Sequence, residues 1–307
     1  MSPSRFVIEP DGAFSLAAAA SFGFGPHTGR PTLDGDLMRL AFAVDGYRGH
    51  AGVVLRQRDE VIDATVEGAR GPAVLRQIER VLSLDHSGGE WLAVGKRDPV
   101  IGRLQRQHPG LRPVLFHSPY EAAAWSVISA RKPRAYAATL RTALATAHGR
   151  VFDLDGEELA AFPLPEKLAA VRAFPGFDAT RMTRLRAIAR AALDGRLDAA
   201  RLAKLSPEDA RAELETLPGI GPFYADLVLV RATGLADLLP RNEPILLSYA
   251  GHFYGDGTAV DMPTLGSIAE RWRPYRTWAA VLIRVAGDRA GLPVDKRRPI
   301  GRARMRP

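Results

Sequence analysis

The sequence predicts a mainly α-helical protein that begins with a smaller antiparallel α+β domain. Two patterns indicate this fold class. Residues 1–112 contain short apolar runs separated by the turn dipeptides Asp11-Gly12, Asp34-Gly35 and Asp45-Gly46, which is typical of strands joined by tight turns. From residue 118 onward, capping residues and apolar residues at helical spacing predominate.

The N-terminal domain is predicted to contain three strands and a helix. Residues 37–44, 52–55 and 61–66 are rich in the β-branched and aromatic side chains that a half-buried sheet prefers. Residues 71–84 instead carry apolar side chains at helical spacing. The Gly- and Pro-containing stretch 98–117 is typical of a boundary, so we expect this domain to span 1–112.

The remainder is predicted to be a helical core over residues 113–295. Ser118-Pro119-Tyr120-Glu121 has the residues of a capping box with proline in the first helical turn. Further helices are expected from near Arg134 to Gly149 and from Asp178 to Gly195, and Ser206 repeats the capping pattern. Residues 296–307 form a basic C-terminal tail that is either solvated or bound to a polyanion.

Composition and charge narrow the function classes. The 307 residues are 46% hydrophobic and 25% charged, as in ordinary globular proteins large enough for two cores. The chain has no cysteine, which excludes disulfides, thiolate metal sites and cysteine nucleophiles. Its net charge of +8 favours polyanionic partners such as nucleic acid.

The sequence favours a cytoplasmic, nucleoid-associated location. No apolar run approaches the roughly 20 residues needed to span a bilayer, so no membrane partner is expected. Glu9 and Asp11 precede the apolar segment 16–24 where a secretory signal would carry positive charge. We expect a monomer.

The most specific segment is Leu217 to Pro222 (LPGIGP), between a helix that begins after Ser206 and a second apolar helix. Two glycines in three positions permit a sharp turn between the helices, so residues 206–233 form a hairpin. Amides at the start of the second helix would bind an anion, and on a basic protein the natural anion is a nucleic-acid phosphate. The candidate DNA-backbone contacts are Pro218, Gly219, Ile220, Gly221 and Phe223.

This segment resembles the helix-hairpin-helix motif of the DNA glycosylase superfamily. Leu217 to Asp226 (LPGIGPFYAD) is most similar to the alkylated-base (3-methyladenine) glycosylase II branch. Ala269 to Ala280 (AERWRPYRTWAA) and, more weakly, Glu121 to Arg131 are similar to other blocks of that branch. The resemblance covers 117–290 and implies a helical glycosylase core with its cleft between two helical lobes.

The implied activity is excision of a damaged base from double-stranded DNA. The enzyme flips the base out of the duplex and hydrolyses its N-glycosidic bond. A carboxylate stabilises the oxocarbenium character that develops on the sugar, or helps a water to attack. Alkylated purines are good leaving groups, so a strong general acid is not required.

The family's catalytic Asp, at the start of the helix after the hairpin, is missing from this chain. Glu243 is the favoured replacement, because Pro244 suits the first turn of a new helix and leaves Glu243 at the cap. Asn242 is a better capping residue by type and is the alternative, a neutral group in place of the Asp. Asp237 is a third option. If the carboxylate has been lost, the chain would be a non-enzymatic protein that binds damaged or distorted DNA, or its pocket would serve another small ligand.

Related bifunctional enzymes carry a lysine two residues after the second hairpin glycine, and this chain has Phe223 there. A strand-cleaving lyase step through a Schiff base is therefore not expected. Aromatic faces would stack on an electron-poor alkylated base, unless they belong to the core. Arg284 falls where this branch often has such an aromatic. The candidate base-pocket residues are Trp125, Tyr224, Trp272, Tyr275, Trp278 and Arg284, with Phe223 in either the pocket or the hairpin.

Other signals are weaker. Arg131, Lys132 and Arg134 precede a helix and would either grip phosphates or form a solvated basic face. The seven histidines show no metal-binding spacing, and no phosphate-binding or dinucleotide fingerprint is present. No cofactor or metal is expected, apart from a monovalent cation at the hairpin carbonyls that the resemblance suggests.

Overall fold

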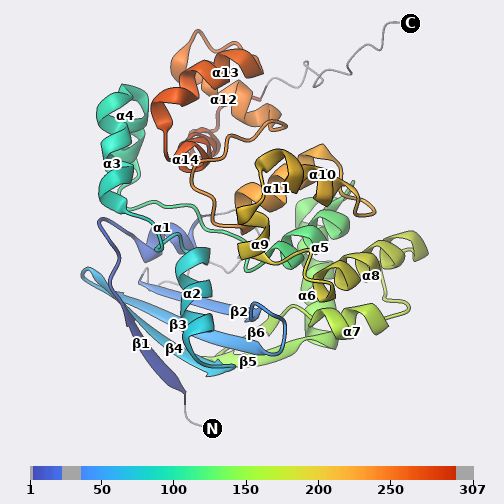
Figure 1. Ribbon diagram of the computed structural model, residues 1–307. Coiled ribbons are helices and arrows are strands. Elements are labelled where there is room, and N and C mark those ends of the chain that lie inside the picture. Colours follow the sequence, from blue (N-terminus) through green and yellow to red (C-terminus); the bar gives the residue numbers. More distant parts are fainter. Residues whose placement is uncertain (1–2, 23–35, 295–307) are drawn as a thin grey trace, which may run out of the picture.

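The computed structural model describes residues 3–22 and 36–294, and its N-terminal part is built on an antiparallel sheet (Figure 1). The strands are β1 (Ser4–Ile8), β2 (Leu37–Ala43), β3 (His50–Arg58) and β4 (Val61–Gly68). Their order is β1-β4-β3-β2, and all neighbours are antiparallel. The three predicted strands are confirmed, and β1 is a strand that the sequence analysis did not predict.

The two faces of the sheet pack against different elements. Val53 and Leu55 share a buried cluster with α2 (Pro72–Val81), which lies within the predicted helix 71–84. Side chains alternate across a strand, so Val54 faces the hairpin of β5 (Arg150–Leu154) and β6 (Glu157–Ala161). Gly52 permits this contact, because a Cβ there would lie 2.6 Å from the ring of Phe152.

Apart from the β5–β6 hairpin, the rest of the described chain folds mainly into helices, as the predicted mainly α fold class requires. The N-terminal part adds α1 (Leu16–Ala20), α3 (Gly88–Arg97) and α4 (Pro99–Gln107). A middle group contains α5 (Pro119–Ser129), α6 (Arg134–His148), α7 (Pro165–Ala170), α8 (Ala179–Leu193), α9 (Ala199–Lys204), α10 (Pro207–Glu215) and α11 (Pro222–Ala232). The last group contains α12 (Pro244–Tyr254), α13 (Met262–Ala269) and α14 (Arg276–Arg289).

The predicted helix starts are confirmed at their caps. Ser118, Asp178 and Ser206 each accept a hydrogen bond from the backbone amide three residues ahead, the usual N-cap contact. Gly149 ends α6, and Gly195, at φ +76°, follows the end of α8. These ends depend on local residues, which explains why the sequence identifies them.

The buried apolar residues form two large clusters that do not divide at the predicted 112/113 boundary. One cluster lies within 116–238 and holds the middle helices. The other joins the sheet and α3–α4 to α12–α14, and helix α14 contacts α4 directly (Figure 1). The last helices therefore pack on the N-terminal part rather than completing a separate core over 113–295. The predicted basic tail, 296–307, and the Asp34-Gly35 turn lie outside the described residues.

Candidate active site

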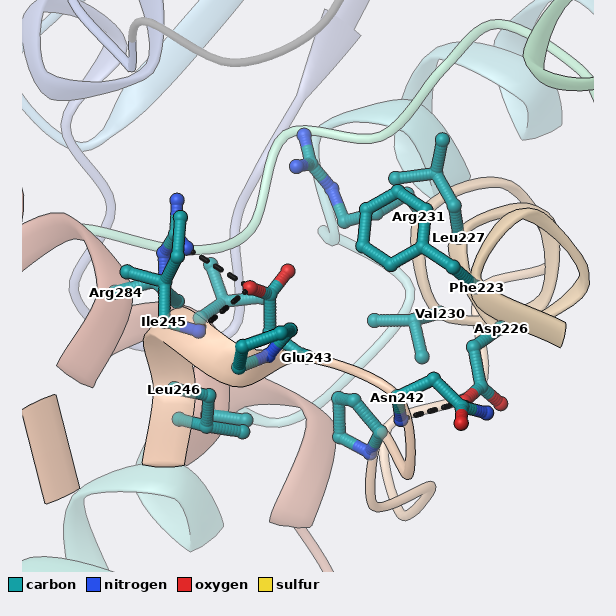
Figure 2. Close-up of a pocket in the computed structure, with 14 residues that line it drawn as sticks. Phe223, Asp226, Leu227, Val230, Arg231, Asn242, Glu243, Ile245, Leu246 and Arg284 are labelled. Carbon is teal, nitrogen blue, oxygen red and sulfur yellow. Dashed lines mark hydrogen bonds and ion pairs between the residues drawn. The ribbon is translucent and has the colours of Figure 1, made fainter. Parts of the chain in front are cut away.

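A cavity of about 360 Å³ lies between α11, from the middle cluster, and α12 and α14, from the other cluster (Figure 2). This is the position that the resemblance implies, a cleft between two helical groups. Its walls are mainly apolar, with charged groups at a few points. The lining residues are Phe223, Asp226, Leu227, Val230, Arg231, Pro240, Asn242, Glu243, Pro244, Ile245, Leu246, Ala280, Val281 and Arg284.

Glu243 is the N-cap of α12, with Pro244 as the first helical residue, as the sequence predicts. Its Oε1 accepts hydrogen bonds from the backbone amide of Ile245 at 3.2 Å and from Arg284 Nη1 at 3.0 Å. Both contacts use the same oxygen, and Figure 2 shows the other oxygen directed to the side of the cavity where Phe223 and Arg231 lie. The carboxylate is therefore held in place by one oxygen while the second faces the cavity.

The surroundings of Glu243 act on its pKa in opposite directions. Burial raises the pKa above the ordinary glutamate value, the charge of Arg284 and the Ile245 amide lower it, Asp288 raises it, and Arg231 lowers it. Burial is the largest of these effects and the net shift is upward. A carboxylate that is partly removed from water interacts strongly with positive charge that develops next to it.

Asp226 on α11 fixes the loop that carries Glu243, and the sequence analysis did not single it out. Its carboxylate is buried, and Oδ1 accepts from Arg211 Nε at 2.6 Å. Oδ2 accepts from the backbone amides of Arg241 at 3.0 Å and Asn242 at 3.1 Å, and from the Asn242 side chain at 2.9 Å. The side chain of Asn242 is thus turned toward Asp226 (Figure 2), and Asn242 does not cap α12.

Two guanidinium groups line the cavity on either side of Glu243. Arg284, on α14, also lies over the ring of Tyr249, 5.6 Å from its centroid. Arg231, on α11, is buried and donates to the carbonyl oxygen of Val114 at 2.6 Å. Burial, together with the smaller effect of the positive charges of Arg134 and Arg284, lowers the pKa of Arg231 to about 9. The guanidinium is therefore still protonated at neutral pH. After Asp226, Arg231 is the second charged lining residue that the sequence analysis does not predict.

Most of the predicted base-pocket aromatics lie elsewhere. Trp272, Tyr275 and Trp278 are buried in the cluster that joins α14 to the N-terminal part, and the rings of Tyr275 and Trp278 are 5.0 Å apart. Trp125 and Tyr224 are partly buried against the middle cluster. The prediction that these five residues line the base pocket is wrong for this cavity, because three of them are buried in one core and two pack against the other.

Phe223 and Arg284 are the predicted pocket residues that do line the cavity. Phe223 is 41% exposed, and it lies in the first turn of α11, directly after the hairpin loop. Its ring therefore connects the cavity to the predicted phosphate contact. The lining residues that the structure describes include no lysine.

The hairpin loop has the backbone form that the sequence predicts. Gly219 has φ +95°, a conformation that favours glycine. Gly221 is the N-cap of α11 without a side-chain capping bond, and a Cβ added there would meet nothing within 4 Å. Ile220 contributes only its backbone at this surface, since its side chain is buried and its amide donates to Leu217 O at 3.0 Å.

The remaining candidates lie outside the cavity. Asp237 forms ion pairs with Arg276 at 2.8 Å and Arg273 at 3.0 Å and does not line the cavity. Arg131 and Arg134 are exposed, and Lys132 Nζ lies 4.8 Å from the ring centroid of Tyr136. Their contact with phosphate stays a prediction. Within residues 3–22 and 36–294, no cluster of three or more acidic or histidine side chains is arranged to hold a metal ion, and no helix could cross a membrane.

Known proteins resemble this chain in sequence. No family model matches it. A DNA-3-methyladenine glycosylase of Bacillus subtilis is 26% identical over 221 residues, which cover 69% of this chain and 71% of that protein. A probable bifunctional transcriptional activator/DNA repair enzyme AlkA of Mycobacterium tuberculosis is 29% identical over 203 residues, 65% of this chain but 40% of that protein.

Solved structures share the fold. The 3-methyladenine DNA glycosylase of Archaeoglobus fulgidus matches with a TM-score of 0.73 and 22% identity, over 92% of this chain and 98% of that one. An 8-oxoguanine glycosylase/lyase of Clostridium acetobutylicum, in complex with double-stranded DNA, matches with a TM-score of 0.61 and 17% identity, over 79% and 86%. Fold and sequence agree on the class that this chain resembles, which is the helix-hairpin-helix DNA glycosylase superfamily. Its predicted resemblance to the 3-methyladenine glycosylases within that class is confirmed.

Proposed function

We propose that this chain is a DNA repair glycosylase that hydrolyses the N-glycosidic bond of an alkylated or otherwise destabilised base in double-stranded DNA. The observation that carries the proposal is the carboxylate of Glu243, fixed at the start of α12 inside a cavity that opens beside the hairpin. The sequence relatives named DNA-3-methyladenine glycosylase and AlkA support the same class of activity.

The reaction follows from the chemistry of the cavity. The damaged nucleotide leaves the base stack and enters the cavity, which a damaged base does more readily because it stacks or pairs poorly. The bond between C1′ and the base nitrogen breaks, and its electron pair leaves with the base. Glu243 stabilises the positive charge that develops on the sugar and accepts a proton from the water that bonds to C1′. The products are an abasic sugar and the free base. An uncharged base takes up one proton as it leaves, whereas a cationic alkylated base leaves as a neutral molecule and the proton from water passes to the solvent.

The proposed enzyme is monofunctional. A lyase step needs an amine that attacks C1′ to form a Schiff base. Phe223 occupies the position after the hairpin where related bifunctional enzymes carry a lysine, and the described cavity lining contains no amine side chain. Strand cleavage at the abasic product is therefore not part of the proposal.

The test is the release of free base by the full chain from duplexes that carry methylated or deaminated bases, with binding to an abasic-site duplex measured in parallel. We expect release of at least one of these bases, with abasic strands left intact until alkali is added. Binding without any release would overturn the proposal and support the alternative, a protein that recognises damaged DNA without cutting it.

The hairpin gives a second, independent prediction, because the open space at Gly221 would be filled by the DNA backbone. Gly221→Ala adds a methyl group without strain in the free protein, since φ is −100° and no atom lies within 4 Å of the new Cβ. We expect duplex affinity to fall about tenfold, or ~1.4 kcal/mol, with the melting temperature unchanged. Gly266→Ala, which adds a methyl group in equally open space on α13, is the matched control. Equal affinity of both variants would exclude the hairpin contact.

Three further expectations stay predictions. The chain is proposed to act as a monomer, in the cytoplasm, and without an organic cofactor. A monovalent cation at the hairpin would bind carbonyl oxygens, of which Leu217 O already accepts the amide of Ile220. No step of the proposed reaction depends on such an ion.

A further inference from the structure

The cavity is poorly suited to a positively charged base. Both carboxylates in its described lining are already paired with guanidinium groups, Asp226 with Arg211 at 2.6 Å and Glu243 with Arg284 at 3.0 Å. A cationic base would lie beside the protonated guanidinium of Arg231 in a mainly apolar space, where like charges repel strongly.

The aromatic side chains of the cavity also indicate that it is poorly suited to a positively charged base. A cationic base gains most from stacking on tryptophan or tyrosine. Trp272, Tyr275 and Trp278 are instead buried in the core, and the described lining contains the single ring of Phe223. On α14 the guanidinium of Arg284 lines the cavity, at the position where the resemblance to the alkylated-base glycosylases predicts an aromatic side chain.

The polar groups that remain offer hydrogen-bond donors. The amide of Asn242 is bonded to Asp226, whose carboxylate receives four donors. A guanidinium has five N–H donors and no acceptor, and the guanidinium groups of Arg231 and Arg284 both line the cavity. Donors of this kind recognise carbonyl oxygens on the edge of a base.

The same groups favour the departure of an uncharged base. When the C1′–N bond of a neutral base breaks, the electron pair goes to the base nitrogen, so the leaving group becomes an anion until it takes up a proton. Fixed positive groups stabilise that charge as it develops. A cationic base leaves as a neutral molecule and gains nothing from them.

We propose that the cavity selects an uncharged base that carries ring carbonyl oxygens, with Arg231 and Arg284 as the residues that determine this specificity. The inference rests on the proposed glycosylase function, and it names the substrate class within that function. Oxidised and deaminated purines, such as 8-oxoguanine, hypoxanthine and xanthine, belong to this class, whereas 7-methylguanine and 3-methyladenine in DNA carry a positive charge.

The experiment compares kcat/KM for release of hypoxanthine, xanthine and 8-oxoguanine with that for 7-methylguanine and 3-methyladenine, each in duplex DNA. We expect the preferred carbonyl-bearing base to be released at least about tenfold faster than either cationic base, a difference of ~1.4 kcal/mol. In Arg231→Gln and Arg284→Gln this ratio should fall about tenfold. The ratio is the readout because loss of Arg284 also disturbs Glu243 and slows release of every base.

Arg289→Gln is the matched control, since Arg289 is on the same helix but is exposed and bonds His108 rather than lining the cavity. The Arg289→Gln variant should leave the ratio unchanged.

Two arginine variants are used because Arg231 is buried and its replacement could prevent folding, which circular dichroism would reveal. Faster release of a cationic base, or a ratio that neither arginine variant moves, would overturn the inference and leave the glycosylase function intact. Release of no base at all would overturn the proposed function and the inference with it.

Discussion

Glu243→Gln should reduce the rate of base release by about 10³-fold, because a fixed charge next to the transition state contributes several kcal/mol. Glutamine has the same length and retains an oxygen that can accept the amide of Ile245, so the start of α12 should be preserved. It cannot oppose the positive charge that develops on the sugar, nor accept a proton from the attacking water. Affinity for an abasic-site duplex, measured in parallel, should change by less than about threefold.

The control for this variant is Glu270→Gln, which removes an exposed carboxylate that also pairs with arginine, at 2.7 Å from Arg273, but lies outside the cavity. Its rate should equal that of the unmodified chain. The pH profile gives an independent check. Burial raises the pKa of Glu243, and the ionised form is the active one, so activity should fall as the pH decreases through a value above the ordinary glutamate range. An unchanged rate in Glu243→Gln would remove Glu243 from the reaction.

The sequence predicts those parts of the fold that depend on neighbouring residues. The caps at Ser118, Asp178 and Ser206 were identified because an N-cap is decided within four residues. The hairpin β5–β6 was missed although it contains the turn dipeptide Asp155-Gly156, with φ of 61° and 79°, a strong local signal. It lies within a region of helical patterns, and two five-residue strands do not change that overall pattern.

The arrangement of the two cores could not be predicted in this way. Helices α12–α14 have apolar faces that the sequence shows, but the surface that covers them comes from residues more than a hundred positions earlier. The spacing of apolar residues in a single sequence shows that a helix has a buried face, but it does not show which other element covers that face. The predicted core over 113–295 followed the order of the chain, whereas the chain returns to its N-terminal part.

The site shows the same limit. Glu243 was found because its place before Pro244 is a local feature, and the cap is confirmed. Trp272, Tyr275 and Trp278 were assigned to the cavity because of their type, but type does not tell which face of a helix meets a cavity. Asp226 and Arg231 are not predicted, because both lie in a helix that the sequence shows only as apolar. Charged residues within the apolar helix α11 are unusual, since buried charges need partners, and that signal could have identified both.

Asp226→Asn should have the second largest effect, because Asp226 joins α11 to the loop before Glu243. The change removes the carboxylate that pairs with the buried guanidinium of Arg211 at 2.6 Å. The other carboxylate near Arg211 belongs to the exposed Glu208 and is 3.7 Å away. Breaking a buried ion pair on one side typically costs about 3–5 kcal/mol. We expect the free energy of unfolding, measured by urea denaturation, to fall by about 3 kcal/mol.

A double variant separates this loss of stability from the role of Asp226 in placing Glu243. Arg211→Met with Asp226→Leu removes both charges, and an apolar pair of similar size is often as stable as a buried ion pair. Most of the stability should therefore return. The amides of Arg241 and Asn242 would still lack the carboxylate that accepts them at 3.0 and 3.1 Å, so the loop that carries Glu243 would no longer be fixed to α11. We expect base release to stay at least about tenfold slow in this stable variant. Recovery of the rate together with the stability would show that Asp226 serves folding alone.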